Sequence, residues 1–172
     1  MLTTWYQAKF AEVDEDGKQF IAAVTNEFAN LIQQFPLGNR SVNLEIAIEC
    51  YRLALEIRTR AAYPEQWAMT QMNLAIAYRS RIRGERAVNL EEAITCCRLA
   101  LEIRTRAAYP EEWAMTQINL AVAFQHRIKG ERAANLEEAI ACYLLALEIY
   151  THTAFPEKWA GTQNNLDRKS VV

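Results

Sequence analysis

The sequence is poor in glycine and proline, and it has no excess of charge of either sign. Only 5 Gly and 4 Pro occur in 172 residues, too few turn-forming residues for an all-β sandwich. The 19 basic and 21 acidic side chains leave a net charge of −2, so we expect neither nucleic acid nor a membrane as partner. No apolar run is long enough to span a membrane, and residues 1–17 have neither the basic nor the apolar region of a signal peptide, so we expect none. With 51% hydrophobic residues, the composition predicts a compact helical protein in the cytoplasm.

Residues suited to catalysis or to metal binding are also scarce. The two histidines, His126 and His152, have no second ligand at zinc spacing. Cys96 and Cys97 are adjacent on an expected helix, where they point about 100° apart, a poor arrangement for a metal. The sequence contains no Gly-rich phosphate loop and no nucleophile elbow. We therefore expect no enzymatic activity, no cofactor and no metal, with the cysteines as small core residues.

The chain contains an internal repeat with a period of 46 residues. Residues 38–83 and 84–129 share 34 identities in 46 positions, and residues 84–120 and 130–166 share 26 in 37. Most of the few glycine, proline and tryptophan residues follow this period: Gly38, Gly84 and Gly130; Pro64, Pro110 and Pro156; Trp67, Trp113 and Trp159.

The sequence pattern of each unit predicts two helices. The first begins at Pro64, which suits the first helical position, and runs to about Ile82. The second begins at Asn89, read as an N-cap, and runs to about Arg106. Gly84 tolerates the positive φ of the turn between them. Each unit is therefore a helix–turn–helix hairpin, and the chain contains seven main helices.

The repeat also predicts the boundaries of the array. Ile21, Phe28 and Ile32 stand where the next unit has Trp67, Leu74 and Tyr78, so the first unit is a diverged copy. We divide the chain into an N-terminal capping segment (residues 1–16), three repeat units (17–63, 64–109 and 110–155), a final half-unit (156–166) and a tail (167–172). Residues 1–12 include Trp5, Tyr6 and Phe10, and this pattern predicts a short capping helix.

The first helix of each unit carries two apolar faces. At about 100° per residue, one side of this helix forms an apolar stripe that we expect to be buried. It consists of Trp67, Thr70, Gln71, Leu74, Tyr78 and Ile82. The opposite face is apolar too, through Met69, Met72, Ile76, Met115, Ile118 and Val122, and is edged by Arg79, Ser80, Gln125 and His126. Two interpretations remain open. This face is a trough that binds an amphipathic or extended peptide, or it is filled internally by the superhelix or by residues 1–12.

The repeat resembles the tetratricopeptide repeat family. Residues 73–78 (Asn-Leu-Ala-Ile-Ala-Tyr) look like its first-helix signature, and residues 90–94 (Leu-Glu-Glu-Ala-Ile) with Cys97 and Ala100 look like its second. The resemblance covers residues 18–166, although the period of 46 exceeds the usual length of about 34. It is closer to the longer repeats of bacterial, notably cyanobacterial, multidomain signalling proteins, including those with a CHAT domain. The resemblance implies an all-α, right-handed solenoid of about 3.5 hairpins, whose first helices line a concave peptide-binding groove.

The resemblance also implies roles for particular residues. In that family the position of Asn73, Asn119 and Asn165 often faces the groove, where a carboxamide bonds to a ligand backbone. The alternative is that these asparagines bond to the neighbouring helix. The family's cationic clamp for a C-terminal carboxylate is not expected, since methionine and isoleucine occupy the corresponding face.

These observations predict a non-catalytic adaptor that binds a protein or peptide in its groove. The rival hypothesis is self-association into a homo-oligomer. The last helix starts as an internal one and ends early, so its face with Trp159 and Leu166 could pair with a second copy. A third interpretation is that the chain is part of a larger signalling protein whose catalytic domain lies elsewhere.

Overall fold

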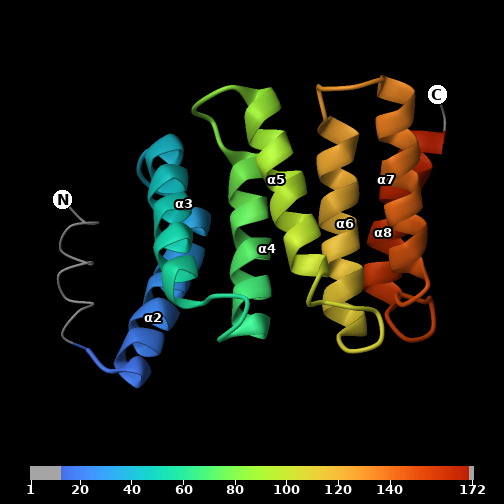
Figure 1. Ribbon diagram of the computed structural model, residues 1–172. Coiled ribbons are helices and arrows are strands. Elements are labelled where there is room, and N and C mark those ends of the chain that lie inside the picture. Colours follow the sequence, from blue (N-terminus) through green and yellow to red (C-terminus); the bar gives the residue numbers. More distant parts are fainter. Residues whose placement is uncertain (1–12, 171–172) are drawn as a thin grey trace.

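The protein is built only from helices over residues 13–170, the part of the chain that the computed structural model describes. The helices pack as consecutive hairpins, α2 with α3, α4 with α5 and α6 with α7, and α8 packs against α7 (Figure 1). This confirms the predicted all-α array of about 3.5 hairpins. The helix bounds are α2 Glu15–Gln34, α3 Arg40–Ile57, α4 Pro64–Ser80, α5 Arg86–Leu101, α6 Pro110–His126, α7 Arg132–Leu147 and α8 Pro156–Ser170.

The first helix of each later unit begins at its proline, as predicted. Proline at this position loses no hydrogen bond, because the first N–H groups of a helix have no partner within it. The helix ends at Ser80, two residues before the predicted end, and Gly84 turns the chain with a φ of +75°. Ile82 therefore lies in the turn and is 61% exposed, so its prediction as a core residue was wrong.

The second helix begins three residues earlier than predicted, at Arg86, and Asn89 is not its N-cap. Asn89 is buried instead, and its Nδ2 donates to the carbonyl oxygen of Arg83 at 2.8 Å. Asn135 makes the same bond, at 2.8 Å, to Lys129 in the next unit. The buried amide thus closes the turn between the two helices, which explains its place in the repeat.

The second helix also ends earlier than predicted, at Leu101 rather than near Arg106. The residues that follow form a turn closed by Thr105. Its hydroxyl accepts from the backbone N–H of Ala108 at 3.2 Å, and its carbonyl accepts from Tyr109 at 2.9 Å. This turn leads directly into Pro110 and sets the position of the next layer.

Neighbouring hairpins are joined by an apolar core and by repeated ion pairs. The core runs through the layers and includes Tyr51, Leu74, Tyr78, Cys97 and Phe124.

The ion pairs recur one unit apart. Arg81 at the end of α4 pairs with Glu45 of α3 at 2.6 Å, and Arg127 at the end of α6 pairs with Glu91 of α5 at 2.8 Å. Each layer is thereby fixed to the one before it by the same two kinds of contact.

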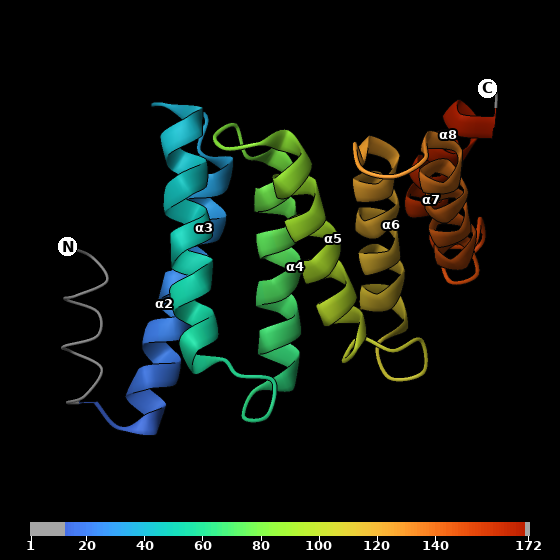
Figure 2. The same cartoon turned by 45° about the horizontal axis from the view of Figure 1, so that its top comes forward.

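The last helix differs from its expected form. It continues to Ser170, beyond the predicted end at Leu166, and closes the array beside α7 (Figure 2). Leu166 is buried against the preceding layer, so it is not available for a second copy, and that part of the self-association hypothesis is wrong. The predicted capping helix in residues 1–12 lies outside the described residues.

Candidate functional site

The second apolar face of the first helices is only partly open. Met115 is 45% exposed, and Met69 and Ile118 are half-buried. Ile76 and Val122 are also half-buried, packed against the core. The prediction that the whole face forms a trough is therefore too broad. Met72 in particular is 3% exposed, and its proposed contact with a partner is corrected because the side chain lies in the core.

A hollow of about 510 Å³ opens between α6 and α8. We call it the α6–α8 hollow. Gly161 has no side chain here, and a Cβ placed on it would meet no atom within 4 Å. The earlier units have Met69 and Met115 at this position, so glycine leaves the hollow unfilled. It is lined by Met115, Ile118, Tyr150, Lys158, Gly161, Thr162 and Asn165.

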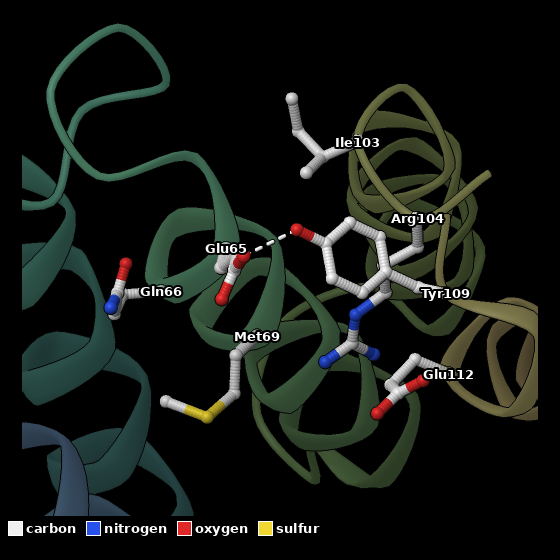
Figure 3. A pocket seen from close by; sticks show the side chains of 7 residues that line it. All are labelled: Glu65, Gln66, Met69, Ile103, Arg104, Tyr109 and Glu112. Carbon is white, nitrogen blue, oxygen red and sulfur yellow. Dashed lines mark hydrogen bonds between the residues drawn. The ribbon is translucent and has the colours of Figure 1, made fainter.

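A second hollow, of about 570 Å³, lies between α4 and α6 (Figure 3). We call it the α4–α6 hollow, and its lining is more polar. It is formed by Glu65, Gln66, Met69, Ile103, Arg104, Tyr109 and Glu112. The two hollows overlap in the repeat frame, since three of the seven residues that line each are equivalent: Met69, Arg104 and Glu112 stand 46 positions before Met115, Tyr150 and Lys158.

The charges of the two hollows differ. In the α4–α6 hollow the hydroxyl of Tyr109 donates to Oε1 of Glu65, which raises the pKa of Tyr109. Burial lowers the pKa of Arg104, and Glu112 opposes that effect. The carboxylates of Glu65 and Glu112 outnumber the guanidinium of Arg104, so the lining of this hollow is acidic.

The α6–α8 hollow has a cation at its edge in place of the second carboxylate. The Nζ of Lys158 pairs with Glu111 at 2.9 Å and lies 4.8 Å from the centre of the Tyr150 ring. The remaining lining is mostly apolar, through Met115 and Ile118. This hollow therefore suits an apolar side chain.

One stretch of the chain is similar to a known repeat family. Residues 67–107 match the tetratricopeptide repeat family. The matched stretch holds most of α4 and all of α5, and the internal repeat places its equivalents in the following unit. No curated protein and no solved structure matches the chain. Tetratricopeptide repeats are generally protein-interaction modules, in which stacked hairpins present an extended surface.

The asparagines that the tetratricopeptide repeat resemblance selected fall into different environments. Asn73 donates from Nδ2 to Oδ1 of Asn30 at 3.0 Å, so it bonds to the neighbouring first helix. Asn119 donates to its own helix at Met115 and accepts from Arg79 at 3.4 Å. Asn165 lines the α6–α8 hollow. The internal alternative thus describes Asn73 and Asn119, whereas the role of Asn165 stays a prediction.

The residues predicted to edge the trough are held by local contacts. Arg79 is half-buried and lines a narrow cleft with Cys97, and burial lowers its pKa. Gln125 accepts from the hydroxyl of Tyr143 at 3.3 Å, and Nδ1 of exposed His126 lies 2.8 Å from the carbonyl oxygen of Val122. The structure does not bring these three side chains into either hollow.

The helical array has few groups suited to other chemistry. Among residues 13–170, no three His, Cys, Asp or Glu side chains are grouped so that they could hold a metal ion. Cys96, Cys97 and Cys142 are buried free thiols, and burial raises the pKa of Cys96 and Cys97 to about 12. No helix in the same range combines the length and apolarity needed to cross a bilayer.

Sequence reasoning missed several lining residues. Gly161, Tyr109, Tyr150, Glu112 and Lys158 contribute to the hollows, and none of them was a candidate. A signal was present in the repeat itself. Gly161 departs from the methionine repeated at its position, and Lys158 stands at a position that differs in every unit; such differences change the surface without changing the fold.

Proposed function

We propose that this chain is a scaffold that binds one segment of a partner protein along α4, α6 and α8. In this proposal the α4–α6 hollow receives a basic side chain, and the α6–α8 hollow receives an apolar one. The partner segment is therefore amphipathic, and specificity comes from the order of these two side chains.

The observation that carries the proposal is the presence of two repeat-equivalent hollows with different chemistry. A hollow that recurred only as a by-product of helix packing would keep the same lining in both units. Here Glu112 is replaced by Lys158 and Arg104 by Tyr150, while the hollow persists. The array thus offers an acidic and an apolar position side by side.

The spacing of the hollows sets the form of the ligand. Packed helices lie roughly 10 Å apart. An extended chain advances about 3.3 Å per residue, so the two anchors would stand about three residues apart. A helical ligand, which rises about 1.5 Å per residue, would need about six or seven. In this proposal Asn165, which lines the α6–α8 hollow, bonds to the ligand backbone next to the apolar anchor.

The test fills one hollow without weakening the protein. Gly161→Met restores the methionine of the earlier units inside α8, where replacing glycine favours the helix by roughly 0.5–1 kcal/mol. Peptides selected from a random display library on the parent protein should bind this variant at least about tenfold more weakly, since 1.4 kcal/mol of lost contact corresponds to a factor of 10. The measurement is fluorescence anisotropy with labelled peptides.

Two further variants control the result. Ala160→Met adds the same side chain on the neighbouring exposed position of α8, outside the hollow, and should leave peptide binding unchanged. Glu65→Lys with Glu112→Lys should change the selected peptides from basic to acidic. Peptides that bind Gly161→Met as tightly as the parent would contradict the proposal.

The wider setting is part of the same proposal. The 46-residue period resembles the long repeats of bacterial signalling proteins, which supports a cytoplasmic adaptor role beside a signalling domain. Purification of the natural complex from its source, followed by mass spectrometry, tests that setting independently of the peptide experiment.

A further inference from the structure

The three turns inside the hairpins lie along one edge of the array. They join α2 to α3, α4 to α5 and α6 to α7, and all three are at the top of the molecule (Figure 1 and Figure 2). The turns that join one hairpin to the next lie along the opposite edge. We call the first set, together with the first three residues of each helix that follows, the turn edge. It consists of residues 36–42, 82–88 and 128–134.

The turn edge is basic, although the chain as a whole is weakly acidic. Its three segments contain five basic and two acidic side chains, which leaves 14 of the 19 basic and 19 of the 21 acidic side chains for the rest of the chain. All five cations are exposed. They are Arg40, Arg83, Arg86, Lys129 and Arg132. The net charge of the whole chain therefore conceals a local separation of charge, which favours an anionic partner at this edge.

The charge of these cations is not cancelled by carboxylates. The two arginines that stand just before the turns, Arg81 and Arg127, are paired with glutamates of the preceding hairpin. Within residues 13–170, none of the five turn-edge cations takes part in an ion pair. The arginines that begin the second helices instead donate to a carbonyl oxygen near the end of the first helix, as Nη1 of Arg86 does to Arg79. A carbonyl oxygen holds the guanidinium at the edge and leaves its positive charge in place.

Large apolar side chains are exposed among these cations. Ile82 and Ile128 occupy the same position in two successive turns, and they are 61% and 60% exposed. Leu37 in the turn of the first hairpin is exposed as well, and so are Val42 and Val88 in the helices that follow. Aliphatic and cationic side chains thus lie together along the edge and recur from one hairpin to the next.

We propose that the turn edge binds the surface of a membrane that contains anionic lipids. At such a surface, aliphatic side chains enter the boundary between the head groups and the acyl chains, while Lys and Arg stay beside the anionic head groups. A nucleic acid would attract the five cations but would offer Ile82 and Ile128 no apolar environment. The segments are spread over three hairpins, so the surface that contacts all of them is extended and nearly flat.

The turn edge is separate from the two hollows, so this inference goes beyond the proposed function and does not depend on it. Glu65 of the α4–α6 hollow is in the first turn of α4, and Tyr109 directly precedes α6. Lys158 and Gly161 of the α6–α8 hollow are in the first two turns of α8. These helix starts belong to the opposite edge of the array (Figure 1). A chain bound to lipid through the turn edge keeps both hollows on the side away from the membrane.

The test measures co-sedimentation of the full chain with lipid vesicles. The parent should bind vesicles of phosphatidylcholine with about 30% phosphatidylserine at least about tenfold more tightly than pure phosphatidylcholine vesicles, and added salt should weaken the binding. Arg83→Gln with Lys129→Gln should weaken binding to the anionic vesicles at least about tenfold. Arg60→Gln with Arg106→Gln removes the same charge at the opposite edge and should change this binding less than about twofold.

A second comparison tests the apolar contribution. Ile128→Gln removes an aliphatic side chain from the turn edge and should weaken binding to the anionic vesicles at least about fivefold, because less apolar surface leaves water. The control is Leu144→Gln, which changes a leucine of similar exposure, 52%, near the far end of α7. This control should bind as the parent does. Circular dichroism of each variant shows whether its helices are intact.

Several outcomes would overturn the proposal. One is a parent that binds neither kind of vesicle or binds both equally; its retention on double-stranded DNA or on an acidic peptide would then assign the edge to a different anionic partner. Another is an equal loss of binding in the two paired charge variants, because binding would then follow the net charge of the chain alone. Equal binding by Ile128→Gln and Leu144→Gln would also contradict it, since no aliphatic side chain of the turn edge would enter the lipid.

Discussion

A coupled exchange of two core residues distinguishes the middle unit from its neighbours. In the first unit the hydroxyl of Tyr51 lies 3.0 Å from Oε1 of Gln33, and in the third that of Tyr143 donates to Gln125 at 3.3 Å. The middle unit replaces the tyrosine by Cys97 and the glutamine by Arg79.

The two replacements fill the same space. Cys97 and Arg79 line one cleft that is too narrow to hold a water molecule. The long guanidinium thus occupies room that the phenol ring takes in the other units, and it reaches Asn119 of α6 at 3.4 Å. We infer that the pair was exchanged as a unit.

The perturbation is Cys97→Tyr, alone and with Arg79→Gln. The single variant adds a ring to a filled site, which costs about 1–3 kcal/mol. For a chain of 172 residues this lowers the Tm by roughly 2–12 °C, at 2–4 °C per kcal/mol. Arg79→Gln removes the guanidinium from this space and provides the amide oxygen that accepts from the tyrosine in the other units. Such a hydrogen bond contributes about 1 kcal/mol. The double variant should therefore unfold within about 1 kcal/mol of the parent.

The assay is urea unfolding followed by circular dichroism, with a double-mutant cycle for the coupling energy. Gln125→Arg beside Tyr143 is the reverse half of the exchange and should destabilise the third unit. The reasoning is refuted if the destabilisations by Cys97→Tyr and by Arg79→Gln simply add, so that the double variant is less stable than Cys97→Tyr alone.

Three further predictions concern the turns, the ion pairs and the thiols. Asn89→Ala should lower the free energy of unfolding by about 0.5–1.5 kcal/mol, because the turn loses the hydrogen bond that the buried Asn89 amide donates to the carbonyl of Arg83; a loss below 0.5 kcal/mol in urea unfolding would contradict this. The hydrogen bond from Arg81 lowers the pKa of Glu45, so the stabilisation by this carboxylate is present at neutral pH and disappears as the pH falls through the lowered pKa. Glu45→Gln should accordingly be less stable than the parent at pH 7 but equal to it in acid, and a difference that persists in acid would oppose the argument. A thiol reagent at pH 8 should modify half-buried Cys50 first and buried Cys97 only after unfolding, as mass spectrometry of the native and urea-treated protein would show.

The sequence predicted the fold well because the repeat constrains each unit independently. The period, the prolines and Gly84 located the starts of the first helices and the turns, and the apolar periodicity identified the core face. The role of Asn89 was mistaken because an asparagine before an acidic pair has the pattern of an N-cap. Its contact with Arg83, six positions earlier, depends on the path of the turn.

The candidate site was predicted less completely. Periodicity gives the direction of a side chain on its own helix, but exposure depends on the next layer. Met72 and Ile118 are equivalent in sequence, yet the first is in the core and the second lines a hollow. Gly161 leaves that hollow open, and this effect requires the relative position of α6 and α8.

The repeated layer contacts make the array extensible by whole units. Thr70, Leu74 and Ala77 recur as Thr116, Leu120 and Ala123, and the same Arg–Glu pair joins α4 to α3 and α6 to α5. A duplicate of residues 64–109 inserted after Tyr109 would meet on its N-terminal side the residues that unit 110–155 already meets, and on its C-terminal side unit 110–155 itself. Each insertion would add one more recess along the first helices, so under the proposed function the number of units would set the length of the partner segment that is bound.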